Sequence, residues 1–307
     1  MPRCSAIIVT YNSANSVGEC LRALAGEDCE IVVVDNDSQD DTVALVEAFH
    51  AQHPLQLIRI SRNLGFAAGV SHGVRAASGD VLLILNPDAI AQAGAVSALE
   101  SCMRAHSADA AGGALLEASG ELQRGFVFRR LPTLASLLCE ALLINQVWPR
   151  NPVNRRYRCL DADYSKPQPV EQPAGACLAV TREAWEAVGG MDTQFAPVWF
   201  EDVDLCKRLL DSGRTIFYCP SARFRHSGAH SVGKLSFADK QLFWYTNMLR
   251  YARKHFSATK VWILRIGIIK GMCLRLLAAW LGAGPEGVPA REARQAYRNV
   301  VKLAFRS

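Results

Sequence analysis

Apolar and polar residues alternate in blocks over the first 90 positions. Four short, mostly apolar runs indicate buried strands, at residues 5–10, 30–35, 55–60 and 81–85. Between them lie helix-forming stretches, including one that begins near residue 41 and one across 67–77. Strands that alternate with helices in this way are typical of a parallel sheet with right-handed crossovers. The pattern therefore predicts an α/β, doubly wound nucleotide-binding half.

Polar residues follow two of these strands at their carboxyl ends. The run at 30–35 ends on Asp35, and the run at 81–85 is followed by Asn86, Pro87 and Asp88. Pro87 has no backbone N–H, so it ends the strand pairing just before the carboxylate. Ligands of open α/β sheets bind beyond the carboxyl ends of the strands, which makes Asp88 a candidate for holding a metal ion against a phosphate. A turn in which the Asn and Asp side chains bond their own backbone is the alternative.

The pattern is less regular beyond residue 90. The predicted elements there are a helix at 95–106, strands at 110–116 and 175–180, a short helix capped by Thr181, and an edge strand at 215–219. An irregular insert at 126–173 contains an apolar helical stretch at 134–147, a Pro-rich run, and six arginines: Arg129, Arg130, Arg150, Arg155, Arg156 and Arg158. Such an insert is often a lid or an acceptor-binding segment, and a solvated basic loop is the alternative.

Three acids cluster at the start of a helical pattern, after two aromatic residues. Glu201, Asp202 and Asp204 follow Trp199 and Phe200. The helix macrodipole favours acids in a first turn, which accounts for one or two of them as structural residues. Three acids beside two bulky rings are harder to explain in that way, so the segment is a candidate functional site.

The sequence beyond residue 234 is wholly helical in pattern. The stretch at 261–283 is strongly apolar but contains Arg265, Lys270 and Arg275. Three charges in a span of this length argue against a transmembrane helix, because each is costly at the bilayer centre. An interfacial helix whose long basic side chains reach the head groups fits better, and a helix packed on the catalytic domain or on a second subunit is the alternative.

Composition and charge narrow the class of protein. Half of the 307 residues are hydrophobic and 21% are charged, as in ordinary globular proteins. The net charge of +5 has its basic excess in the insert and the C-terminal third, which favours an anionic membrane surface over nucleic acid as a partner. No G-x-G-x-x-G follows Thr10 and no Walker P-loop is present, which argues against a Rossmann oxidoreductase and against P-loop phosphoryl transfer.

The cysteines and the N-terminus indicate a compartment. Ten cysteines are scattered along the chain without a C-x-x-C pair, and we interpret them as small core residues and stray thiols. The N-terminal residues already have the pattern of a strand, so we expect no signal peptide. A reducing, cytosolic compartment is the simplest assignment.

Six segments resemble, in the same order, those of the family 2 glycosyltransferases with the GT-A fold, most closely the rhamnosyltransferase-like members. They are Val9-Thr10-Tyr11-Asn12, Val34-Asp35-Asn36-Asp37-Ser38-Gln39-Asp40, Asn63-Leu64-Gly65-Phe66-Ala67-Ala68-Gly69, Leu85-Asn86-Pro87-Asp88, Gly189-Gly190-Met191-Asp192 and Phe200-Glu201-Asp202-Val203-Asp204-Leu205. Each is weak alone, but six in register make a coincidence very improbable. The resemblance covers residues 5–232 and implies a GT-A catalytic domain over 1–235, containing the insert at 126–173, and a helical extension over 236–307.

The resemblance also implies roles for individual residues at the donor. The expected donor-nucleotide-binding residues, among which Asp35 bonds the base, are Thr10, Tyr11, Asn12, Asp35, Asn63, Asn86 and Asp88. Asp88 matches the last acid of the family's D-x-D metal site, and Asn86 stands where the first acid often is. Diphosphate oxygens, water and His226 would then complete the ligands of Mg²⁺ or Mn²⁺. A hydrogen-bonded structural histidine is the alternative for His226.

Roles at the acceptor follow in the same way. Asp202 matches the family's catalytic base, which takes the proton of the acceptor hydroxyl, and Glu201 is expected to orient the acceptor. Trp199 and Asp204 are expected at the acceptor, and helix capping is the alternative for Asp204.

The expected function is inverting sugar transfer, with L-rhamnose from dTDP-L-rhamnose as the donor, onto a polyprenyl-linked glycan in cell-surface polysaccharide biosynthesis. UDP-sugars (galactofuranose, glucose or N-acetylglucosamine) are alternative donors, and a catalytically silent nucleotide-sugar-binding protein is an alternative function. We expect a cytoplasmic protein bound peripherally to the inner face of the cell membrane, with no nucleic-acid partner. An oligomer is compatible with the sequence.

Overall fold

The computed structural model describes residues 4–228, 233 and 235–306. The chain divides into two compact units. The first unit comprises Met1–Leu131, Arg158–Pro197 and Glu201–Ser231, and the second comprises Pro132–Tyr157, Val198–Phe200 and Val232–Ser307. The family resemblance covers residues 5–232, and the last four residues of that range, 229–232, lie outside the described residues.

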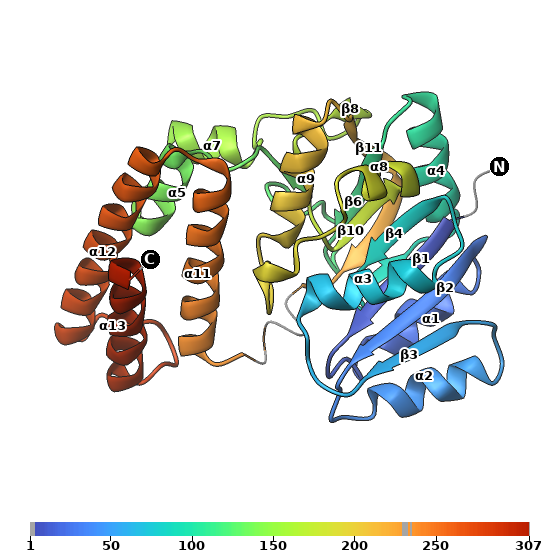
Figure 1. The fold of residues 1–307 in the computed structure, drawn as a ribbon, viewed down its shortest axis with the longest axis horizontal. Helices are drawn as coiled ribbons and strands as arrows, with labels where there is room; N and C mark the ends of the chain where they lie inside the picture. The colour runs from blue at the N-terminus through green and yellow to red at the C-terminus, as the bar shows by residue number, and fades with distance from the viewer. Residues whose placement is uncertain (1–3, 229–232, 234, 307) are drawn as a thin grey trace. The chain divides into compact units, whose positions relative to one another are not determined.

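A mixed sheet forms the centre of the first unit (Figure 1), with the strand order β3-β2-β1-β4-β10-β6-β11-β5 and β8 paired to β11. The strands are β1 (Cys4–Thr10), β2 (Cys29–Asn36), β3 (Gln56–Ile60), β4 (Val81–Leu85), β5 (Ala89–Ala91), β6 (Ala110–Leu116), β8 (Gln168–Pro169), β10 (Cys177–Thr181) and β11 (Ile216–His226). Neighbours among β3, β2, β1 and β4 are parallel, as the alternating pattern predicts, whereas β10 runs antiparallel to both of its neighbours. A second, two-stranded sheet joins β7 (Phe128–Arg129) to β9 (Gln172–Pro173).

Helices cover both faces of the sheet. The first unit contains α1 (Val17–Leu24), α2 (Thr42–His50), α3 (Phe66–Ala76), α4 (Ala95–Ala105), α8 (Arg182–Ala187), the 3₁₀ turn Thr193–Phe195 and α9 (Glu201–Asp211). Alternate residues of β1 enter two separate apolar clusters, Ile8 with α1, α2 and α4, and Ile7 with α3, α8 and α9. The result is a three-layer α/β/α core in which β4 is buried along its whole length.

Glycines let α3 lie close to the sheet. A Cβ at Gly73 would overlap Cγ2 of Ile7, and one at Gly69 would lie 2.7 Å from Cγ1 of Val9. Both partners belong to β1, so this approach fixes the helix directly over the strand whose tip carries Thr10.

Two predicted elements are wrong in extent. The expected edge strand at 215–219 is the eleven-residue β11, which lies inside the sheet between β6 and β5. A shift of register between Cys219 and Arg223 lets the pairing with β6 continue past Pro220. The single helix expected at 134–147 is two helices, α5 (Leu134–Ala141) and α6 (Ile144–Val147), because Leu143 between them is left-handed, with φ of +66°.

The structure also corrects the interpretation of the cysteines. Cys102 of α4 and Cys219 of β11 form a disulfide, although 117 positions separate them. The other eight cysteines do not form disulfides. The spacing of the cysteines along the chain does not predict this pair. Because the structure contains a disulfide, the cysteines no longer support a reducing compartment.

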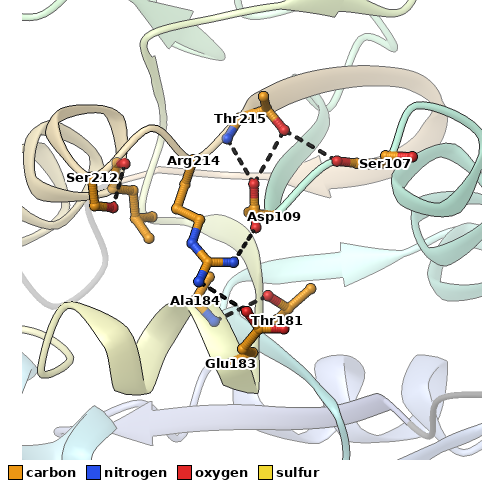
Figure 2. A network of polar contacts seen from close by, with 9 residues as sticks. Ser107, Asp109, Thr181, Glu183, Ala184, Ser212, Arg214 and Thr215 are labelled. Carbon is orange, nitrogen blue, oxygen red and sulfur yellow. Dashed lines mark hydrogen bonds and ion pairs between the residues drawn. The ribbon is translucent and has the colours of Figure 1, made fainter.

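A charged network ties β6, β11 and α8 together (Figure 2). The Arg214 guanidinium lies 2.8 Å from Oδ1 of Asp109 and 2.9 Å from Oε1 of Glu183, and the backbone N–H of Thr215 donates to Oδ2 of Asp109 over 2.8 Å. Burial opposes ionisation of Asp109, but the hydrogen bonds from Thr215 and the charge of Arg214 outweigh it and lower the pKa of this carboxyl. The network stabilises the end of the sheet at which β6 and β11 begin, opposite the carboxyl ends of the parallel strands.

The second unit is helical. It contains α5, α6, α7 (Pro152–Tyr157), α11 (Phe237–His255), α12 (Ala258–Trp280) and α13 (Ala290–Arg306). Part of the insert belongs to this unit, since α5 packs on α12: a Cβ at Gly271 would overlap the carbonyl oxygen of Ala141, and Arg275 Nη1 donates to the same oxygen over 2.6 Å. Within the described ranges, no helix has both the length and the apolar character needed to cross a bilayer.

Candidate active site

The tips of β1 and β2 bring three predicted donor residues together. Thr10 and Asp35 are register partners, and the Thr10 hydroxyl donates to Oδ1 of Asp35 over 2.9 Å. The backbone N–H of Ser38 donates to Oδ2 over 3.0 Å. Asn12, left-handed with φ of +52°, donates its N–H to the Ser38 hydroxyl and accepts from the N–H of Gln39 over 2.7 Å. The two loops are thereby fixed to each other, with Asp35 held between them.

A buried asparagine that the sequence analysis did not select orients the next loop. Asn36 donates from Nδ2 to Oδ1 of Asn63 over 3.0 Å and to the carbonyl of Gly65 over 3.2 Å, and its Oδ1 accepts from the N–H of Leu64. Asn63 Oδ1 also accepts from the N–H of Gly65, over 2.9 Å. The expected donor residue Asn63 is exposed, and these hydrogen bonds hold its side chain in place.

Asp88 and His226 meet beyond the end of β4. Both are buried, and Nε2 of the histidine lies 3.6 Å from Oδ1 of Asp88. The Gln123 amide donates to the His226 carbonyl over 2.8 Å, so its Oε1, 3.0 Å from Nδ1, is the acceptor there. The proton is then on Nδ1, and Nε2 presents its lone pair toward Asp88.

This pair fits the demands of a divalent ion. The distance of 3.6 Å exceeds that of an N–H···O hydrogen bond. Two ligands of one small divalent ion, each bonded at about 2.1 Å, lie about 3 to 4 Å apart. The described part of the chain contains no cluster of three or more His, Cys, Asp or Glu side chains suited to a metal. A bound ion could therefore take Asp88 and His226 from the protein and its remaining ligands from elsewhere.

Asp202 lies at the start of α9, partly buried and held by three donors. Its Oδ2 accepts from the N–H of Gly175 over 3.0 Å and from Nε2 of Gln172 over 3.2 Å, and its Oδ1 accepts from the N–H of Val203 over 2.8 Å. Burial raises the pKa of Asp202 above the usual range, while these backbone donors and the positive charge of Arg129 oppose the rise. A raised pKa suits a general base, because such a base works best when its pKa lies near the pH of the reaction.

The sequence did not predict a role at the site for Arg129 or Gln172. The two residues are partners in the pairing of β7 with β9, so the small second sheet brings an amide donor and a cation to Asp202. Both lie in the irregular insert, where no periodic pattern predicted a strand.

Backbone contacts connect the surroundings of Asp202 to those of Asp88. The N–H of Asn86 donates to the carbonyl of Ala176 over 3.0 Å, and Gly175, the preceding residue, donates to Asp202. Asn86 in turn lies two residues before Asp88. The first unit therefore brings the two carboxylates to the same end of the sheet, at the adjoining ends of β4 and β10.

The two acids beside Asp202 differ in their surroundings. Glu201 is buried, and no described group bonds its Oε2. Burial and the neighbouring charge of Asp202 hold its pKa well above the usual value. Asp204 is fully buried in an ion pair with Arg208, 2.8 Å from Nε, and Arg208 also donates to the carbonyl of Gly190. This position inside the protein argues against the expected contact of Asp204 with the acceptor.

The expected acceptor residue Trp199 belongs to the second unit. Trp199 and Phe200 are both left-handed, with φ of +77° and +73°, and both rings pack on Trp244 at centroid distances of 5.6 and 5.2 Å. The buried Asn247 holds this segment by donating to the carbonyl of Val198 over 2.8 Å. Two consecutive aromatic residues in a sparsely populated conformation are typical of a functional segment.

Trp199 lines a cavity of about 570 Å³ within the second unit. Its walls combine aromatic rings with polar and charged groups, including Trp199, Trp244, Tyr245, Gln146, Gln241 and Arg275. A volume of this size and a mixed lining are typical of small-molecule sites.

Known proteins are similar in sequence to most of this chain. A family model described as glycosyl transferase family 2 matches residues 5–158, and one described as the N-terminal domain of galactosyltransferase matches residues 155–230. The chain is 30% identical over 244 residues to an N-acetylglucosaminyl-diphospho-decaprenol L-rhamnosyltransferase of Mycobacterium tuberculosis, over 74% of this chain and 77% of the relative.

Solved structures give the fold. A mannosyltransferase of Pyrobaculum calidifontis, PcManGT, in complex with GDP-Man and Mn²⁺, is similar with a TM-score of 0.56 at 17% identity, over 99% of this chain and 84% of that one. GalNAc-T7 with UDP, GalNAc and Mn²⁺ gives a TM-score of 0.61 at 15% identity, over 100% and 56%. The fold is that of the GT-A glycosyltransferases, as the sequence predicted. The chain belongs to the family 2 glycosyltransferases, and its relatives include a rhamnosyltransferase.

Proposed function

We propose that the protein transfers a sugar from a nucleotide-diphosphate donor to a hydroxyl group, with inversion at the anomeric carbon. The supporting observation is the placement of Asp88 and Asp202 at one end of the sheet, connected through Asn86, Ala176 and Gly175. Inversion requires the leaving diphosphate and the attacking hydroxyl to lie on opposite sides of the sugar. In this proposal Asp88 would serve the side of the leaving diphosphate, and Asp202 would serve the side of the attacking hydroxyl.

The donor would lie across the tips of β1, β2 and β4. In this proposal Asp35 accepts a hydrogen bond from the base, and Thr10 and Ser38 hold its carboxylate in position. Tyr11, Asn12, Asn63 and Asn86 would border the nucleotide. Asp88 and His226 would hold Mg²⁺ or Mn²⁺, with Gln123 fixing the tautomer of the histidine. When bound, such an ion neutralises charge on the leaving diphosphate.

Asp202 would take the proton of the acceptor hydroxyl. Oδ2 holds two hydrogen bonds in the protein, which fixes the carboxylate plane, and Oδ1 holds one, so a lone pair of Oδ1 can receive the proton. Glu201 stands next to it with a raised pKa, and in its neutral form it can donate a hydrogen bond to orient the acceptor.

The donor sugar in this proposal is L-rhamnose from dTDP-L-rhamnose, which the 30% identical rhamnosyltransferase supports. UDP-galactofuranose, UDP-glucose and UDP-N-acetylglucosamine are the alternatives. A thermal-shift panel of these nucleotide sugars, each with Mn²⁺ and with a chelator, separates them, because selective stabilisation reports binding by linkage. The competing function, a nucleotide-sugar-binding protein without catalysis, predicts stabilisation by a donor without any turnover of it.

Replacement of the base tests the mechanism. We expect Asp202→Asn to bind the donor as the wild type does and to lose about 10² to 10⁴ of the transfer rate. Asp211→Asn, which changes an exposed acid at the other end of α9, is the matched control. Donor binding is measured by calorimetry and transfer with a labelled donor. Unchanged turnover in Asp202→Asn contradicts the assignment.

The acceptor would be a polyprenyl-linked glycan at the inner face of the cell membrane, and its glycan would occupy the cavity beside Trp199. The name of the mycobacterial relative, which includes a decaprenol-linked sugar, supports the lipid-linked class. Aromatic rings offer flat apolar surfaces to sugar rings, and the amides of Gln146 and Gln241 can bond the hydroxyls.

Removal of one ring tests the acceptor cavity. We expect Trp244→Ala to raise KM for the acceptor about tenfold, with KM for the donor unchanged, since the cavity loses the ring on which Trp199 and Phe200 pack. Trp148→Ala removes an exposed ring elsewhere in the same unit and is the control. Equal changes in both constants argue against an acceptor role.

A further inference from the structure

The outer face of α12 is mostly apolar and is exposed. Large apolar side chains repeat along it at helical spacing and are 37 to 78% exposed: Ile263, Leu274, Leu277, Trp280 and Leu281. The opposite face is also apolar, with Leu264, Ile268 and Met272 buried against the rest of the second unit. Arg265 and Arg275 donate to backbone carbonyls of Ala304 and Ala141, whereas Lys270 is exposed among the outer apolar side chains. The outer side of α12 lacks a partner among the described residues of the second unit.

The surroundings of this face are strongly basic. The second unit has 17 Lys and Arg residues against 4 Asp and Glu, a net charge of +13, whereas the first unit has 17 against 25, a net charge of −8. The exposed positions of α13, which packs on α12, include Arg291, Arg298, Lys302 and Arg306. An apolar stripe thus lies beside a basic one (Figure 1 shows the two helices).

Tryptophans mark both ends of the stripe. Trp262 and Trp280 are 60 and 65% exposed. A separation of 18 positions in a helix corresponds to about 27 Å along the axis. The Arg294 guanidinium lies 4.5 Å from the ring centroid of Trp280, so a cation accompanies that ring. Trp is the residue that prefers the boundary between lipid and water, with its ring at the level of the head groups.

We propose that α12 and α13 form the surface by which this protein lies on an anionic lipid bilayer. The apolar stripe of α12 would enter the head-group region parallel to the membrane plane, and the basic side chains of α13 would contact anionic head groups. A second copy of the chain is a poorer occupant, because two surfaces of the same strong positive charge repel each other. The inference rests on the proposed function, since a lipid-linked acceptor requires the enzyme to reach a membrane.

The test uses the full chain and vesicles of two compositions, neutral phosphatidylcholine and phosphatidylcholine with phosphatidylglycerol. We expect cosedimentation with the anionic vesicles, weakened by salt. The double variant Leu274→Gln with Leu277→Gln should lose about tenfold or more in binding, because two exposed apolar side chains no longer enter the lipid. Leu45→Gln, which changes an exposed leucine of α2 in the first unit, is the control and should bind as the wild type does.

Charge reversal tests the second stripe. Arg298→Glu with Lys302→Glu should weaken binding to anionic vesicles, and Arg59→Glu with Arg104→Glu, an equal change of net charge in the first unit, should weaken it far less. Wild-type protein that ignores anionic vesicles, variants that bind as the wild type does, or a dimer that the leucine variants dissociate would each overturn the proposal. Donor hydrolysis in solution is measured on the same variants, so loss of the membrane surface and failure of the proposed chemistry give different results.

Discussion

The acids at the start of α9 show how one residue's surroundings decide its role. Glu201 and Asp202 are adjacent, yet Asp202 has three hydrogen-bond donors and a nearby arginine, whereas Oε2 of Glu201 has no described partner. An ionised Glu201 would be a second buried charge next to Asp202, which is why its pKa lies well above the usual value. Ionisation is therefore less costly for Asp202 than for Glu201.

This difference predicts how stability depends on pH. Because the pKa of Glu201 is higher in the folded chain than the value of about 4.3 in the unfolded one, the residue costs nothing at low pH and destabilises the fold as pH rises through its folded pKa. We expect Glu201→Gln to match the wild type near about pH 4. At higher pH its Tm should exceed that of the wild type by about 2 to 4 °C, the shift that about 1 kcal/mol gives in a domain of this size.

Thermal unfolding across this pH range measures the effect. Glu186→Gln, an exposed acid on α8, is the control and should leave the pH dependence unchanged. Parallel Tm curves for the wild type and Glu201→Gln would show that Glu201 is ionised in the folded protein.

At the scale of elements, the contact between α5 and α12 depends on a residue without a side chain. In an exposed helix interior, Gly→Ala stabilises by about 0.5 to 1 kcal/mol. Gly271 should behave in the opposite way, because its Cβ would overlap the carbonyl oxygen of Ala141, a backbone atom that cannot rotate away. We expect Gly271→Ala to destabilise the protein by about 1 to 3 kcal/mol.

Chemical denaturation measures this change. Gly18→Ala in α1 is the control, since its new Cβ would meet only the flexible end of Arg22 at 3.4 Å. That variant should be neutral or slightly more stable. If Gly271→Ala were equally harmless, α5 and α12 would not pack as closely as described.

Some elements could be predicted from the sequence because burial leaves a simple pattern. The residues of β1 and β4 are mostly apolar and are buried on both faces, so the extents of these strands were predicted within one residue. The extent of β11 was not predicted, because exposed Ser221 and Arg223 and half-buried Arg225 alternate there with buried residues beyond a proline. The break in the helix at Leu143 has no glycine or proline to mark it.

The candidate site was predictable to a similar degree. Asp35 and Asp88 could be selected because carboxyl ends of parallel strands share one edge of a sheet. Gln172 and Arg129 could not, because only the pairing of two-residue strands within an irregular insert brings them to Asp202. Asn36 has a role that depends on a loop 27 positions away.

At the scale of the whole molecule, the two units do not follow the division expected from the sequence. Residues 132–157, expected as part of the catalytic domain, group with the C-terminal helices, as does the segment Val198–Phe200. Leu137, Cys139 and Ala141 of α5 are buried in this arrangement. We therefore expect the helices at 236–307 to depend on residues 132–157 for their packing.

A truncation tests this conclusion. We expect a chain that ends at residue 235 to be recovered mainly in the insoluble fraction, because it lacks α12, on which the buried face of α5 packs. Soluble yield and thermal unfolding, compared with those of the full chain, measure the effect. A soluble truncated chain with a cooperative transition would mean that residues 132–157 do not need the C-terminal helices.

The opposite net charges of the two units, −8 and +13, also affect the solubility of the protein. Each molecule offers its neighbours both signs, so we expect molecules to attract one another at low ionic strength and the solution to become turbid as the protein is concentrated. Added salt shortens the Debye length from about 30 Å at 0.01 M to about 10 Å at 0.1 M and should redissolve the protein. A cation-exchange column should likewise retain the protein far more strongly than its overall charge of +5 indicates.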